Sequence, residues 1–206
     1  YNANASTAME LASNGFVSIG GDSPLTPLHV KYSAAGELLR LESTDAGAGL
    51  GPQIGLYRNS SSPAPGDNLG SINFYGEDSA GNQTTYATIE SETYGVSNGT
   101  ESGRLHFKVI ESASLISRLY INHAETVVNE SSHNVDFRVE SNDNFAALFV
   151  DAGNNRVGVF NDAPGYPLSV VGTTEIKSQL YLGSSNSDPG ILSIYDTSTT
   201  AYTLNF

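Results

Sequence analysis

The residues best suited to bind a metal ion are spread through this sequence and share no motif. Four histidines occur, His29, His106, His123 and His133. No two of them have the i and i+2 spacing that would place two ligands on one face of a strand. His29 and His106 lie in the apolar runs LHV and LHF, which favour core or subunit-interface side chains. We therefore predict no metal site and no cofactor.

Paired carboxylates could support glycoside hydrolysis, which uses two carboxyl groups roughly 5 to 9.5 Å apart across a cleft. Glu90 and Glu92 have the spacing to share a strand face, and Glu101 lies near a predicted turn. Acidic pairs on an exposed strand are usually just solvated, however, and no Gly-x-Ser-x-Gly motif accompanies the many serines. We expect no catalytic residue and no enzymatic activity.

Two oxygen-rich segments, residues 140–144 and 151–155, contain the side chains that calcium prefers. Neither segment has the ligand spacing of an EF-hand, and Asn and Asp are also the residues that tight turns select. We interpret both segments as turns between the elements that flank them.

The overall charge excludes one large class of partners. The 206 residues include 22 Asp and Glu against 9 Lys and Arg, which gives a net charge of −13. Nucleic acids and anionic membranes would be repelled, and no cluster of Lys or Arg offers a local exception. No stretch approaches the roughly 18 consecutive apolar residues of a membrane span. We predict neither nucleic-acid binding nor membrane insertion. Because the chain has no cysteine, its cohesion comes from packing, hydrogen bonds or assembly.

The elements that must position these residues are predicted to be strands. Apolar and polar residues alternate over short runs, the period of half-buried strands, and sustained helical periodicity is absent. Turn-forming clusters such as Asn98-Gly99 and residues 151–154 separate the runs. The fold class is therefore all-β, with strands expected at residues 16–19, 28–32, 38–42, 54–58, 71–75, 84–90, 104–110, 115–121, 135–139, 147–150, 157–160 and 168–171.

One phrase occurs twice in the chain. Residues 14–30 and 154–170 align without a gap, with seven of 17 positions identical. About one identity would be expected by chance, so the two segments are copies of one supersecondary unit. Each copy reads as a strand, a turn containing two prolines, and a second strand. Such a unit buries too little apolar surface to be stable alone and needs neighbours or other copies of the chain.

The repeated phrase resembles one found in bacteriophage tail fibres and related virion appendage proteins, Val-Gly-Ile-Gly-Thr followed by Pro and Leu-x-Val. Here it stands as Val17-Ser18-Ile19-Gly20 with Pro24 and Leu28-His29-Val30, and again as Val157-Gly158-Val159-Phe160 with Pro164 and Leu168-Ser169-Val170. Ser18 and Phe160 each replace a glycine of the commonest form. Residues 70–109 and 136–159 also resemble segments of virion structural proteins.

The resemblance implies a parallel homotrimer with elongated β-rich segments, located in the virion and in contact with other virion structural proteins. The expected architecture is a set of shaft-like β-repeat segments flanking a β-sandwich-like module. The boundaries are an N-terminal repeat segment at residues 1–44, the central module at 45–125, a second repeat segment at 126–183 and a C-terminal β segment at 184–206. In a trimer, a histidine near the threefold axis would meet its two copies and could hold an ion.

The function expected from these features is a non-enzymatic structural component of a phage tail fibre or capsid fibre that contributes to host-surface attachment. Exposed aromatic residues of the central module are the candidates for contact with a host glycan, because aromatic rings stack on sugars. They are Tyr57, Tyr75, Tyr86 and Tyr94. The alternatives are a module of a bacterial surface adhesin or filament, and a tailspike that depolymerises polysaccharide.

Overall fold

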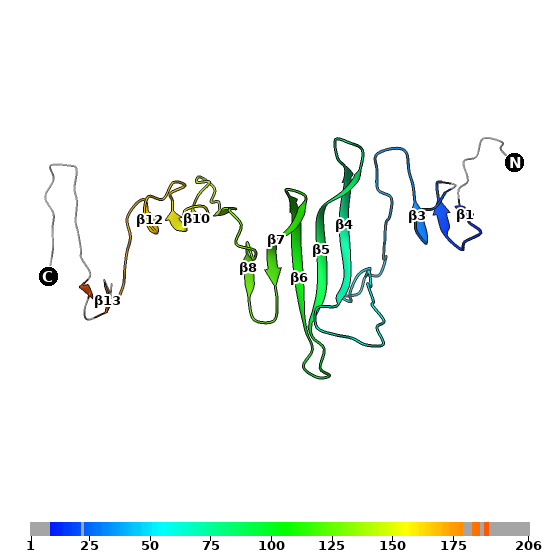
Figure 1. Ribbon diagram of the computed structural model, residues 1–206, viewed down its shortest axis with the longest axis horizontal. Helices are drawn as coiled ribbons and strands as arrows, with labels where there is room; N and C mark the ends of the chain where they lie inside the picture. Colours follow the sequence, from blue (N-terminus) through cyan, green and yellow to red (C-terminus); the bar gives the residue numbers. More distant parts are fainter. Residues whose placement is uncertain (1–8, 22, 179–182, 186–187, 190–206) are drawn as a thin grey trace. The chain divides into compact units, whose positions relative to one another are not determined.

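The computed structural model describes residues 9–21, 23–178, 183–185 and 188–189 (Figure 1). The chain divides into two units, Tyr1–Arg58 and Asn59–Phe206. The described residues form strands and irregular segments and include no helix, which confirms the all-β class. Most of the expected C-terminal segment lies outside the described residues; β13 (Gly183–Ser185) and β14 (Asp188–Pro189) form a small antiparallel pair there.

The central sheet is an antiparallel meander in which strand order follows chain order (Figure 1). Its strands are β4 (Asn68–Glu77), β5 (Gln83–Gly95), β6 (Ser102–Glu111), β7 (Ser114–Ile121) and β8 (Thr126–Val128). The turn at Asn98-Gly99 lies between β5 and β6 as predicted, with Gly99 at φ +82°. Between β6 and β7 only Ser112 and Ala113 intervene, both at positive φ, as a two-residue hairpin turn requires.

The expectation of a sandwich-like module was wrong for the single chain. One face of the central sheet is apolar, because the register places Ile72, Ile89, Phe107 and Leu119 side by side across four strands. A sandwich would cover this face with a second sheet. Ile72, however, is 51% exposed, and Phe74 on the same strand is 54% exposed. The alternating sequence specifies a two-faced sheet but does not say whether the covering layer comes from the same chain.

The two copies of the repeated phrase form the same structure. In the first, β2 (Val17–Ile19) pairs in parallel with β3 (Leu28–Val30), and β1 (Met9–Leu11) pairs antiparallel with β2. In the second, β11 (Arg156–Val159) pairs in parallel with β12 (Leu168–Val170). On the other side of β11 lie β10 (Leu148–Asp151) and then β9 (Phe137–Val139).

The register of the parallel pair is identical in both copies. Val17 stands opposite Leu28, and Val157 stands opposite Leu168. The backbone hydrogen bonds match as well: the N–H of Val17 donates to the carbonyl oxygen of Pro27 at 2.8 Å, and that of Val157 to Pro167 at 2.8 Å. The connection between the two parallel strands therefore has the same length in both copies, which confirms that the sequence repeat is a structural repeat.

One position of the repeat has the same backbone conformation in both copies but holds a glycine in only one of them. Gly20 and its counterpart Phe160 both have positive φ, +77° and +52°. This left-handed conformation suits glycine and is unfavourable for a phenylalanine, by about 1–3 kcal/mol. The backbone path of the unit is therefore the same in the second copy even though its sequence has lost the residue best suited to it.

Two predicted strands are absent from the described structure. Residues 38–42 and 54–58 show strand-like alternation, but neither pairs with any strand described here. Four strands were missed, and each has only two or three residues: β1, β8, β13 and β14. A strand this short carries little alternation of its own, and the three-residue strands β2, β3, β9 and β12 were expected because each lies within a longer run.

Candidate functional site

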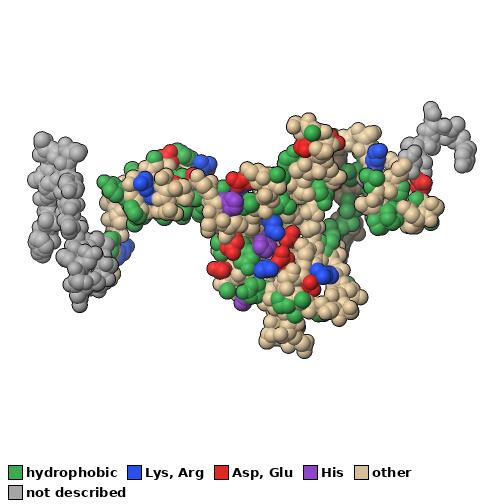
Figure 2. Space-filling model, in the orientation of Figure 1, with side chains coloured by type: hydrophobic (Ala, Val, Ile, Leu, Met, Phe, Trp, Pro, Cys, Tyr) green, Lys and Arg blue, Asp and Glu red, His purple; other side chains and the backbone are tan. Residues whose placement is uncertain are grey.

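The polar face of the central sheet holds the largest group of ionisable side chains that the fold brings together. Residues two apart on a strand share a face, so Glu90 and Glu92 of β5 lie on the same side. Strand β6 contributes Arg104, His106 and Lys108 to that side, because the register pairs Glu90 with His106 and Glu92 with Arg104. Figure 2 shows acidic, basic and histidine side chains gathered over this part of the molecule.

Both carboxylates on this face are ion-paired. Glu92 Oε2 accepts a hydrogen bond from the guanidinium of Arg104 at 2.6 Å, and Glu90 Oε1 accepts one from Lys108 Nζ at 2.6 Å. The four side chains are between 17% and 28% exposed, so solvent screens these pairs less than it would on an open surface. The pairs fix the orientation of β5 relative to β6 and leave little room for a ligand between the carboxylates.

The pKa of Glu90 is lower than its ordinary value. Burial raises the pKa, but the hydrogen bond from Lys108, a hydrogen bond with Glu92 and the positive charge of Lys108 together outweigh that effect. A glycosidase acid must instead have a raised pKa, so that it is protonated at the working pH. The pair that looked best suited to sugar hydrolysis therefore has the electrostatics of a structural ion-pair network.

His106 lies in the middle of this face, next to the one buried aromatic ring of the sheet. Its ring packs against that of Tyr120, with the centroids 4.9 Å apart and the planes tilted by 51°, and its Nδ1 lies 3.2 Å from Ser117 Oγ. The Nε2 atom is buried without a hydrogen-bond partner. Burial first, and then the charge of Lys108, lowers the pKa of His106. The sequence predicts a core or subunit-interface position for His106, and in the single chain its side chain is half-buried among polar residues.

Folding stability should fall as pH drops below about 6.5 because of His106. The unfolded chain takes up a proton at the ordinary histidine pKa of 6.5, whereas the folded chain takes it up only at a lower pH. Between these two values the unfolded state binds more protons, so the free energy of unfolding decreases as pH falls. Thermal unfolding at stepped pH measures this effect. His106→Phe, which retains an aromatic ring beside Tyr120, should remove the decrease just below pH 6.5.

A second decrease in the free energy of unfolding is expected at lower pH. Glu90 has a lowered pKa in the fold, so its contribution is present above its ordinary pKa of 4.5 and is lost as pH falls below that value. In His106→Phe only this second decrease should remain. A pH profile of the variant that matches the wild type throughout would contradict the role assigned to His106.

An aromatic cluster lies at the end of this face where β5 leads into the β5–β6 turn. The ring of Tyr94 stacks on His123 with centroids 5.0 Å apart, and the guanidinium of Arg104 lies 5.7 Å from the centroid of Tyr94. Tyr94 is 46% exposed. A half-exposed tyrosine beside an arginine and an imidazole offers both a stacking surface and hydrogen-bond donors, which is the chemistry of a weak sugar contact.

The four tyrosines predicted as receptor contacts come from different parts of the chain. Tyr57 belongs to the first unit, while the other three belong to the central sheet. Tyr75 and Tyr86 lie near the β4–β5 turn, where the hydroxyl of Tyr86 donates to the carbonyl oxygen of Glu77 at 3.2 Å. Tyr94 lies at the opposite end of β5. Its ring contacts both the imidazole of His123 and the guanidinium of Arg104.

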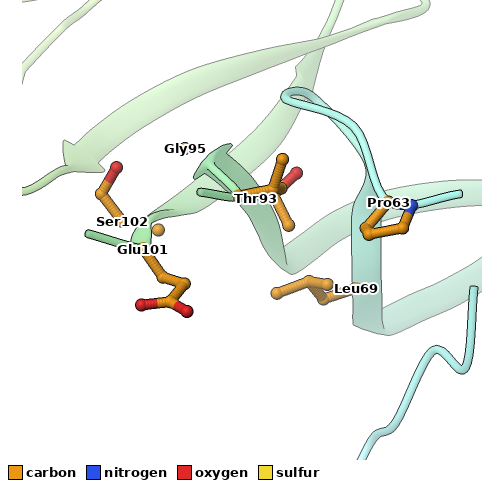
Figure 3. Close-up of a pocket in the computed structure, with 8 residues that line it drawn as sticks. Pro63, Leu69, Thr93, Gly95, Glu101 and Ser102 are labelled. Atoms are coloured by element: carbon orange, nitrogen blue, oxygen red, sulfur yellow. The ribbon is translucent and has the colours of Figure 1, made fainter. Parts of the chain in front are cut away.

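A shallow hollow of about 420 Å³ lies beside the same end of the sheet (Figure 3). Pro63, Leu69 and Thr93 form one wall of it, and Glu101 and Ser102 form the other. Thr93 holds the preceding loop in place, since its hydroxyl donates to the carbonyl oxygen of Ala64 at 2.7 Å. The surface of the hollow is mainly apolar.

The ion pairs of the polar face have a signal in the sequence. The acids at 90 and 92 alternate along one strand, and the bases at 104 and 108 alternate, around His106, along the next predicted strand. Complementary alternation of this kind favours cross-strand ion pairs. Tyr120 and Ser117 carried no such signal, because their position beside His106 depends on the irregularity in the β6–β7 register between Phe107 and Lys108.

Comparison with known proteins gives no family for the chain. No family model matches it, and no curated protein is significantly similar to it. The described residues include no group of three or more His, Cys, Asp or Glu residues that could hold a metal ion. No helix long and apolar enough to cross a membrane occurs in the described ranges.

Proposed function

We propose that the chain is a structural, non-enzymatic subunit of a homotrimeric virion appendage, a segment of a tail fibre or capsid fibre. The observation that carries the proposal is that each main sheet has an apolar face that the chain leaves uncovered. In the second repeat sheet this face is formed by two residues from each strand. They are Phe137, Val139, Leu148, Val150, Val157, Val159, Leu168 and Val170.

The exposure of these faces is large for a chain acting alone. Leu168 is 63% exposed, and on the first repeat sheet Met9 and Leu11 are 65% and 71% exposed. In the part of the chain that the structure describes, the only buried hydrophobic residues are Tyr120 and Ala146. Burying one such side chain fully contributes about 1.5–3 kcal/mol. Contiguous apolar faces of this kind mark association surfaces, and a second copy of the chain always carries the matching face.

The trimeric state and the location in a virion are supported by the resemblance of the repeated phrase to phage appendage proteins. Closed symmetry lets every copy bury the same faces. The polar face of the central sheet would then point outward, with Tyr94 as the residue best placed to contact a host-surface glycan. Three copies on one particle would add weak contacts together as avidity.

Sedimentation equilibrium of the purified chain tests the proposal, with a trimer as the expected species. Because the sequence has no cysteine, a single introduced cysteine reports contacts between copies without interference. Val170→Cys on the apolar face should form disulfide-linked dimers within the trimer, whereas Arg138→Cys on the opposite face of the same sheet should not. A stable monomer at micromolar concentration would exclude the architecture. Electron microscopy of particles labelled on this chain tests its place in a virion.

A further inference from the structure

Residues 37–56, in the last part of the first unit, have the alternating sequence of strands but pair with no strand that the structure describes. Residues 39–46 and 50–60 contain no turn, bend, helix or β-ladder. No backbone hydrogen bond joins residues 37–56 to any described strand. The hydrogen bonds of residues 37–56 come from local side chains, such as Glu37 with Arg40 at 2.8 Å and Asp45 with the N–H of Gly47 at 3.0 Å.

The large apolar side chains of this segment are exposed and have the spacing of a strand. Leu39 and Leu41, which share a face in an extended chain, are 67% and 47% exposed. Ile54 and Leu56 repeat the same spacing and are 68% and 55% exposed. Because water can solvate unpaired backbone groups, the absence of backbone hydrogen bonds does not by itself distinguish a linker from a strand without its partner. A solvated linker is rich in small or polar residues, whereas a strand that pairs carries large apolar residues at alternate positions. The two exposed apolar pairs of this segment follow the second pattern.

From this we infer that residues 37–56 form strands only in the assembled protein, by pairing with the same residues of another copy of the chain. The inference rests on the proposed homo-oligomer and adds to it a second kind of interface, made by the backbone rather than by apolar faces. It also accounts for the two failed strand predictions: the strand-like pattern is real, and the partner is missing from the single chain.

The partner that we infer is a second copy of the chain, because the segment does not use the free strand edge of its own unit. Strand β3 lies at the edge of its sheet with one side unpaired, and residue 37 follows it by seven positions. No backbone hydrogen bond joins the segment to that edge. In an oligomer joined through the flanking sheets, the identical segments of different copies are tethered at both ends, which raises their effective concentration.

Hydrogen exchange of the intact protein measures the pairing directly. The single-chain structure predicts rapid exchange for the amides of residues 38–42 and 54–56, as for the loop at 96–101. The inference predicts slow exchange, comparable with that of β4. Backbone pairing protects amides, whereas contact between side chains alone does not.

Cysteine substitution identifies the partner. Identical residues on neighbouring parallel in-register strands lie about 4.8 Å apart, within the Cα separation of about 4.4–6.8 Å that a disulfide requires. Leu41→Cys and Ile54→Cys should therefore oxidise to linked dimers, and Ala80→Cys in the exposed β4–β5 turn serves as the control for random collision. Linked dimers together with slow exchange support the inference.

Two outcomes would overturn the inference while leaving the proposed function intact. The first is a trimer in which residues 38–42 exchange as fast as the loop at 96–101. The second is slow exchange with no linked dimer at either position, which would show pairing within one chain. A monomer in sedimentation would instead reject the proposed function itself.

Discussion

Val159→Asp should dissociate the assembly. Val159 lies on the apolar face of the second repeat sheet, with Leu148 opposite on β10 and Val170 opposite on β12. A carboxylate there is buried without a partner when copies associate, at a penalty of several kcal/mol. Because each 1.4 kcal/mol changes an equilibrium constant tenfold, the dissociation constant should rise by at least about a hundredfold. Sedimentation across a concentration series measures this change.

Arg138→Asp is the matched control for that experiment. Arg138 belongs to β9 of the same sheet but lies on the opposite face, where its side chain pairs with Glu140 at 2.7 Å. The substitution changes the charge of each copy by more than Val159→Asp does. If overall charge repulsion caused dissociation, Arg138→Asp would dissociate the assembly more strongly. Dissociation by the control and not by Val159→Asp would reject the apolar face as the interface.

Gly158→Ala should unfold the second repeat sheet locally. A Cβ atom at Gly158 would lie 2.0 Å from the backbone carbonyl oxygen of Asn161, and backbone cannot yield as a flexible side chain does. Overpacking of this kind destabilises by about 1–3 kcal/mol, and backbone contact places the change at the upper end. The expected result is faster hydrogen exchange in β10, β11 and β12 and a lower Tm for that transition.

The first repeat provides the opposite case at the corresponding position. Ser18 is fully buried there, and its hydroxyl has no hydrogen-bond partner. The turn that follows contains Gly20 and Gly21 in place of Phe160 and Asn161, and Ser18 Oγ lies 3.3 Å from where a Cβ of Gly21 would be. Ser18→Ala removes a buried unsatisfied hydroxyl, so stability should stay unchanged or rise by about 1 kcal/mol. Equal effects of the two alanine substitutions would contradict this account.

The sequence predicted the strands that carry several alternations and a clear turn at each end. The strands β4 to β7 and the hairpin of β10 and β11 are of this kind. The pattern at residues 38–42 predicted a strand as strongly, yet the single chain has none there. Alternation reports that a segment can pair but not which chain supplies the partner, and residues 37–56 are the segment that we propose pairs with another copy.

The candidate site was predictable only in part, for a related reason. Glu90 and Glu92 could be placed on one face from spacing alone, but their pairing with Lys108 and Arg104 depends on the β5–β6 register, which the turn sets. The cluster of Tyr94 with His123 joins residues on β5 and after β7, and no local pattern connects positions so far apart in the chain. Of the four candidate tyrosines, the sequence could not distinguish Tyr94 from the others.

The meander order of the central sheet determines at which stage of folding the copies of the proposed assembly would associate. Every strand from β4 to β8 pairs only with its neighbours in sequence, so each hairpin can close within one chain by a short-range search. Topologies dominated by local contacts fold rapidly. Sheet formation should therefore be a unimolecular step that does not depend on protein concentration, followed by a slower bimolecular docking of preformed sheets. In this order the central sheets are already folded when the copies associate, so their strands need not intertwine.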